Sequence, residues 1–257
     1  MRHPLAKHPL AGACARVERA GKHFKELEAL IECFRLKNEQ EFISQHNHAA
    51  IKVRSTLSLR SKAHTKFGPV ETDIAVILGD VMHNLRAALD YLIYELAFTD
   101  SGIEHQGTQF LIEDSKTDTK DANGEVIKRG FNYLAKKRLA GLNPTHIRAI
   151  EALQPYNGVT WTKTLRAISN PDKHRKLTVI AGGGQGSYLT EGGKPGSFKG
   201  RPGKVFAGIG VDGADIYVEG EYSVRVELPD GTPLVKTLEI LEREVRATID
   251  AFKPEFK

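Results

Sequence analysis

The fold is decided by the stretch "GDVMHNLRAALDYLIYEL", which runs from Gly79 to Leu96. At 100° per residue, its leucines and other large apolar side chains fall on one broad arc, which predicts a helix with one buried side. The opposite arc mixes carboxylates, an imidazole, an amide and phenols, and we expect such a face to meet another polar element. This arc carries Asp80, His83, Asn84, Ala87, Asp90, Tyr91 and Tyr94, with Arg86 at its edge.

Polar groups that are buried against another element need hydrogen-bond partners, because each unpaired group costs about 1–3 kcal/mol. The best candidate for the complementary element is "NPDKHR", residues 170–175. Asn170 is expected to cap a helix that begins at Pro171, since Asn is favoured as an N-cap and Pro at the first helical position. The expected contacts join Asp80 and Asp90 to Lys173 or Arg175, and bring His83 opposite His174 across a cleft.

These segments resemble a family of uncharacterised bacterial proteins. The resemblance rests on the blocks "GDxxHNLRxALDxL" at 79–92, "LQPY" at 153–156 and "NxDKHR" at 170–175, and it covers roughly residues 73–177. It implies that these segments belong to one structural unit. It carries no activity, cofactor or ligand with it.

A mainly helical protein with this long two-sided helix is also similar, at the level of the fold alone, to the HEPN ribonucleases. Their signature is an Arg followed by four to six residues and a His. Two pairs have this spacing, Arg2 with His8 and Arg16 with His23, but a chain this rich in Arg and His contains such pairs by chance. Just before the NPDKHR segment, Ser169 stands where an Arg would give the spacing to His174.

The remaining chain predicts several helices and short strands. Apolar residues at helical spacing, together with Pro and Asn caps, predict the helices, and alternating or β-branched runs predict the strands. The region 182–213 is rich in Gly and Lys and is predicted to be a basic loop or a long hairpin. The predicted helices are 13–45, 69–98, 131–140, 144–153, 161–169 and the segment after Thr232-Pro233; the predicted strands lie in 49–59, 107–114, 175–183 and 215–233.

Together these elements predict an α+β protein that is mainly α. We expect a helical bundle with a small antiparallel β element and a C-terminal amphipathic helix. We expect residues 1–257 to form a single domain, in which 10–177 is the mainly helical core and 178–257 holds the hairpin or loop region plus the last helix.

Composition narrows the class of protein further. A net charge of +5 permits an anionic partner such as RNA without requiring one. Two cysteines are too few for a thiolate zinc site or a disulfide framework. The sequence contains neither a signal-peptide pattern nor the run of ~20 apolar residues that a membrane span needs, so we expect a soluble cytoplasmic protein.

One hypothesis is a metal-independent ribonuclease that needs no cofactor. One imidazole would take the 2′-hydroxyl proton and another would protonate the leaving 5′-oxygen, while a guanidinium or ammonium group holds the phosphate. The candidate catalytic residues are His83, His174, Arg86 and Arg175. The candidate substrate-binding residues are Asp80, Asn84, Asp90, Tyr94, Asn170 and Lys173.

Three alternatives remain open. The same residues can form a purely structural polar network. The protein can be a binding module without catalysis, in which Phe198 and Phe206 of the basic loop stack on nucleic acid, or in which the first helix pairs with a partner chain, as in a homodimer. A metal site built on Asp80, His83, Asp172 and His174 is disfavoured, because Lys173 and Arg175 would repel a cation.

Overall fold

The computed structural model describes residues 8–46, 72–174, 180–182, 185–189, 195–199, 225–228 and 232–256. The predicted strand at 49–59 and Arg175 lie outside these residues, as do most of 182–213 and of 215–233. Helix α5 (Thr160–His174) includes Asn170, Lys173 and His174, but their side chains are not among the parts described.

The described part of the chain is mainly helical, as predicted. Its α-helices are α1 (Ala11–His46), α2 (Thr72–Ser101), α3 (Phe131–Arg138), α4 (Pro144–Ala152), α5 and α6 (Leu234–Phe252), with short 3₁₀ turns at η1 (Pro155–Asn157) and η2 (Lys253–Glu255). None of these helices is both long and apolar enough to cross a bilayer.

The chain divides into two compact units, and three of the four boundaries between them fall within helices α1, α2 and α6. The first unit contains Met1–Lys25, Val76–Leu177 and Lys236–Lys257, and the second contains Glu26–Ala75 and Thr178–Val235. The C-terminal helix α6 is therefore mostly part of the first unit. In the second unit, β3 (Ile180–Gly182) pairs antiparallel with β6 (Arg225–Glu227), and β4 (Gln185–Leu189) pairs antiparallel with β5 (Pro195–Lys199).

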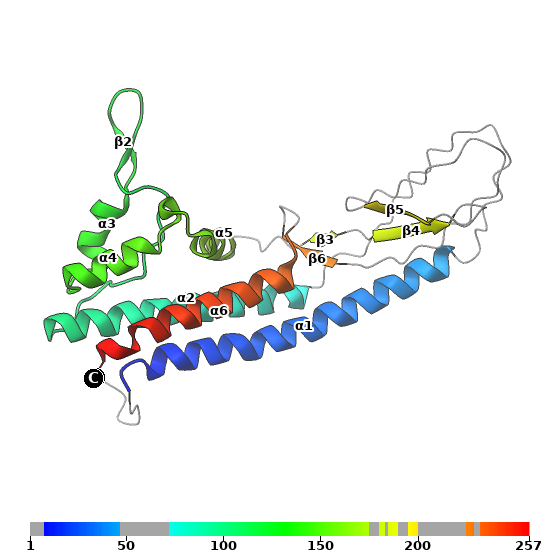
Figure 1. Ribbon diagram of the computed structural model, residues 1–257, viewed down its shortest axis with the longest axis horizontal. Helices are drawn as coiled ribbons and strands as arrows, with labels where there is room; N and C mark the ends of the chain where they lie inside the picture. Colours follow the sequence, from blue (N-terminus) through cyan, green and yellow to red (C-terminus); the bar gives the residue numbers. More distant parts are fainter. Residues whose placement is uncertain are drawn as a thin grey trace. The chain divides into compact units, whose positions relative to one another are not determined.

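The core of the first unit is a packing of α2 with the start of α1 and with α6, which run alongside one another in Figure 1. The apolar arc of α2 predicted from the sequence is buried here. The close approach of α1 to α2 depends on a glycine, because a Cβ added at Gly12 would lie 2.8 Å from the Tyr91 ring. The largest buried side chains of α2 in this core are Leu78, Met82, Leu85, Leu89, Leu92, Ile93 and Leu96.

Helix α5 differs from the sequence prediction. It continues through Asn170 and Pro171 to His174, so Asn170 is not the N-cap of a separate helix. Pro171 lies in the last turn of α5, where it lacks the N–H that would bond to the Ala167 carbonyl, and a proline ring within a helix crowds the carbonyl of the residue four positions earlier. Asn170 and Pro171 are residue types that commonly begin a helix, but here α5 has already begun at Thr160 and continues through both.

A short hairpin connects α2 to α3 through β1 (Thr119–Lys120) and β2 (Val126–Lys128), which pair antiparallel. Asn123 and Gly124 form the turn of this hairpin, where Gly124 adopts a left-handed φ of 82°. The Asp121 carboxylate accepts hydrogen bonds from the backbone N–H groups of Asn123 and Glu125, which fixes the turn.

Replacing Gly130, just before α3, with alanine is expected to destabilise the protein. A Cβ at Gly130 would lie 2.3 Å from the backbone carbonyl carbon and oxygen of Thr117, which cannot move aside as a side chain would. Overpacking of this kind typically costs about 1–3 kcal/mol. Urea denaturation of Gly130→Ala should show that loss.

The matched control is Gly21→Ala in α1. There the new methyl group would meet only the flexible carboxylate end of Glu242, at 3.1 Å, and Ala has a higher helix propensity than Gly by about 1 kcal/mol. We expect Gly21→Ala to be neutral or stabilising. Equal losses for the two variants would contradict the assigned clash at Gly130.

Candidate active site on helix α2

The polar face of α2 holds the backbone of Phe110, in the segment 107–114, through two hydrogen bonds. Asp90 accepts a hydrogen bond from the backbone N–H of Phe110 at 2.9 Å, and Arg86 donates one to the carbonyl oxygen of Phe110 at 2.5 Å. Arg86 and Asp90 are four residues apart and lie on the same side of the helix. The two side chains therefore hold both polar groups of one residue, whose own ring is fully buried.

The same segment is also held by Gln154, which lies between α4 and η1, and by a residue of α5. Gln154, which is fully buried, accepts from the N–H of Glu113 and donates to the carbonyl oxygen of Leu111. Arg166 of α5 donates to the carbonyl oxygen of Ile112 at 2.9 Å. The predicted strand at 107–114 is therefore wrong: its apolar residues are buried, but side chains rather than a neighbouring strand satisfy its peptide groups.

Charged groups gather around this segment. Arg166 also forms an ion pair with Asp114, and Lys128 pairs with Asp114 at 2.9 Å. Hydrogen bonds from these two cations lower the pKa of Asp114 to about 2, whereas burial raises the pKa of Glu113. Burial lowers the pKa of Arg86, opposed by the charges of Asp90 and Glu113. Arg86 Nη1 is enclosed and has no hydrogen-bond partner among the described residues.

The other edge of the α2 face meets α1. Arg16 donates to the side-chain oxygen of Asn84 at 3.3 Å, and its guanidinium carbon lies 5.7 Å from the centre of the Tyr91 ring. The Asn84 amide is oriented by its own donation to the carbonyl oxygen of Asp80, one turn earlier. Tyr91 remains 43% exposed, so this edge presents a cation and an aromatic ring at the surface.

His83 lies between these two edges. At 100° per residue, Asn84 is on one side of His83 and Arg86 is on the other. The His83 and Asp80 side chains are exposed, and Tyr94 is half-buried on the same strip of the helix. The structure thus brings His83, Asn84, Arg86 and Asp90 onto one surface, and it adds Arg16. The predicted contacts of this face with residues 170–175 lie outside the described side chains.

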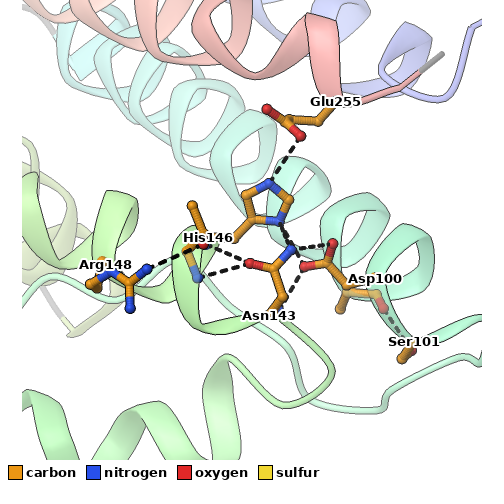
Figure 2. Close-up of polar contacts among 8 residues, drawn as sticks. Asp100, Ser101, Asn143, His146, Arg148 and Glu255 are labelled. Carbon is orange, nitrogen blue, oxygen red and sulfur yellow. Dashed lines mark hydrogen bonds and ion pairs between the residues drawn. The ribbon is translucent and has the colours of Figure 1, made fainter.

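A second polar network closes the far end of α2. Figure 2 shows Asp100 from α2, Asn143 and His146 from the start of α4, and Glu255 from η2. The side chains of Asp100 and His146 are only 8% and 7% exposed, and Asp100 Oδ2 lies 2.7 Å from His146 Nδ1. His146 Nε2 lies 3.5 Å from Glu255, and the ring packs edge-on against Phe252.

The role of this network is to anchor chain segments. Asn143 caps α4, as predicted, by accepting from the N–H groups of Thr145 and His146. Its own backbone N–H and side-chain amide both donate to Asp100 at 2.8 Å. Both ring nitrogens of His146 face carboxylates, so neither is directed at a nucleophile.

No protein-family model, curated protein or solved structure matches this chain. Within the ranges that the structure describes, no group of three or more His, Cys, Asp or Glu side chains is arranged to hold a metal ion.

Sequence reasoning missed Arg16, Gln154 and the Asp100–His146 pair. Gln154 belongs to the "LQPY" block, which the sequence singled out, but the block gave no indication of what Gln154 contacts. Arg16 lies on a helix face rich in Lys, Arg and Glu, where one cation does not stand out. Asp100 and His146 are 46 residues apart, and no motif links them.

Proposed function

We propose that this protein cleaves RNA without a metal ion, with His83 as one of the catalytic groups. The observation that carries the proposal is an exposed imidazole, His83, on a helix face that also holds Arg86 and that Arg16 contacts at the neighbouring Asn84. Arg16 donates to the neutral oxygen of the Asn84 amide, so its charge is available to attract a phosphate, whereas the charge of Arg86 is partly offset by Asp90 and Glu113.

The chemistry needs a base and an acid. His83 would take the proton from a ribose 2′-hydroxyl, the 2′-oxygen would attack the phosphorus, and the bond to the 5′-oxygen would break. The leaving 5′-oxygen would receive its proton from a second imidazole, for which His174, the last residue of α5, is the proposed group. The products are a 2′,3′-cyclic phosphate and a free 5′-hydroxyl.

The two arginines have different roles in this proposal. Arg16 is partly exposed and is the group placed to contact the phosphate. Arg86 has Nη1 enclosed and donates to Phe110, so it is a positioning residue that also adds positive potential. Arg175, Lys173 and Asn170 remain proposed substrate contacts.

The test is cleavage of a 5′-labelled RNA oligonucleotide in EDTA, with the cyclic phosphate as the diagnostic product. We expect His83→Ala to lower the cleavage rate about 10²–10⁴-fold, the usual contribution of a general acid or base. The melting temperature should not change, because the His83 side chain is exposed. His174→Ala should have a similar effect on the rate.

The matched control is His105→Ala. His105 is in the same structural unit, but it hydrogen-bonds to Ser101 beyond the end of α2, away from the His83 strip. It should cleave like the wild type. The ribonuclease proposal fails if the wild type yields no cyclic phosphate, or if His83→Ala and His105→Ala cleave at the same rate.

A second candidate function is RNA binding without cleavage. It is favoured by the Arg16–Tyr91 contact, since a cation beside an exposed aromatic ring is a platform for stacking a base. Binding that depends on Arg16 and Tyr91, in a protein that releases no cyclic phosphate, would support this alternative.

A further inference from the structure

We infer that α3 carries a second contact surface for single-stranded RNA, separate from the His83 strip. This inference takes the class of ligand from the proposed function and adds a docking site for it. We define the α3 patch as Arg129, Tyr133, Lys136 and Lys137, all of which lie in the first unit. Tyr133, Lys136 and Lys137 are at positions i, i+3 and i+4, so they share one face of the helix.

The aromatic part of the α3 patch is already organised. The Arg129 guanidinium carbon lies 4.1 Å from the centre of the Tyr133 ring, and an ion pair with Asp118 at 2.6 Å holds Arg129 in place. The Tyr133 side chain is nevertheless 51% exposed. A large aromatic side chain is thus fixed on one side by a cation while much of its surface faces solvent, as a base-stacking platform requires.

The positive charge of the α3 patch comes from the two lysines. Asp118 neutralises Arg129, but Lys136 and Lys137 are exposed and form no ion pair with any carboxylate that the structure describes. Cations near a helix C-terminus also stabilise the helix dipole. The helix dipole explains why lysines occur at positions 136 and 137. It does not explain why an exposed tyrosine stacked with an arginine lies beside them.

This combination fits single-stranded RNA better than duplex RNA. Unpaired cations attract the phosphate backbone of any nucleic acid, whereas a stacking ring contacts a base only where the base is unstacked. The α3 patch should therefore bind an unpaired strand with little sequence preference and with strong salt dependence.

The test uses a fluorescein-labelled U12 oligonucleotide, and the Kd is measured by anisotropy at several salt concentrations. We expect Lys136→Ala/Lys137→Ala to weaken binding on the order of tenfold and to reduce the slope of log K against log salt by about 1.4, or 0.7 per phosphate contact. Tyr133→Leu should weaken binding about 5- to 150-fold, and Tyr133→Phe should restore it.

The matched control is Lys22→Ala/Lys163→Ala, which removes two exposed lysines of the same unit from α1 and α5. It should leave both the Kd and the salt slope unchanged. The inference is overturned if the control and the Lys136/Lys137 variant lose affinity equally, if neither does, or if only the binding of anionic phospholipid vesicles responds to the patch.

Two measurements separate this inference from the ribonuclease proposal. The Kd for U12 is measured with the α3 substitutions placed in the His83→Ala protein, in which the oligonucleotide should not be cleaved, and the α3 variants with His83 intact should cleave a dinucleotide at the wild-type rate. Binding that depends on the patch in a protein without cleavage would remove the ribonuclease proposal alone. If long RNA is cleaved but the Kd for U12 is the same with and without the α3 substitutions, the docking inference is contradicted and the ribonuclease proposal stands.

Discussion

Replacing Gln154 with alanine is expected to lower the free energy of unfolding by about 3–5 kcal/mol. The substitution leaves the N–H of Glu113 and the carbonyl of Leu111 without the partner that Gln154 provides, and each such group costs about 1–3 kcal/mol when buried. The removed side chain also leaves a cavity, because Gln154 is fully buried. The Ile150 carbonyl retains its bond from the N–H of Leu153. Urea denaturation at pH 7 measures the loss.

Gln154→Ala is also expected to reduce RNA cleavage at temperatures where the variant is still folded. Gln154 holds the segment that Arg86 and Asp90 grip, so a loosened segment would displace Arg86 beside His83. Gln106→Ala is the control, since Gln106 is exposed and should change neither quantity. A loss of less than about 1 kcal/mol in Gln154→Ala would show that the segment is held without this side chain.

Replacing Asp100 with asparagine is expected to cost about 3 kcal/mol, although the two side chains have nearly the same shape. Both Asp100 oxygens accept hydrogen bonds from Asn143, one from its backbone N–H and one from its side-chain amide. The Asn143 amide cannot rotate to help, because its oxygen already caps α4. Either orientation of an asparagine at position 100 therefore places an NH₂ group against a donor.

Thermal and urea denaturation of Asp100→Asn test this prediction. The control is Asp250→Asn in α6, whose carboxylate is 49% exposed and pairs with Lys253 at the surface. It should unfold like the wild type, because exposed ion pairs contribute little. If Asp100→Asn is as stable as the control, the network at the far end of α2 does not anchor α4.

The helices could be predicted because their signals are local. The apolar period of 79–96 predicted α2, and Asn143-Pro144 predicted the start of α4 at the residue where it begins. For most helix ends, the predicted and observed terminal residues differ by a few positions, as expected where tertiary contacts decide the last turn. The Asn170-Pro171 pair misled for the same reason, since a local cap signal does not reveal that the preceding helix continues.

The candidate site was only partly predictable. The sequence indicated correctly that the α2 face, with Asn84, Arg86 and Asp90, meets other polar groups. It also singled out His83, which the structure places in the centre of that face. It did not reveal that the partner of Arg86 is the carbonyl of Phe110, 24 residues further along the chain, or that the partner of Asp90 is the N–H of the same residue, 20 residues further along.

The sequence by itself determined the helical elements and which side of α2 is apolar, because both follow from side-chain periodicity. The tertiary structure alone decided what the polar side contacts. Every residue carries a backbone C=O, and every residue except proline carries a backbone N–H. The sequence therefore does not show which backbone group a side chain will bind. Arg16 with Asn84 and Gln154 with Glu113 are brought together across 68 and 41 residues only when the helices pack.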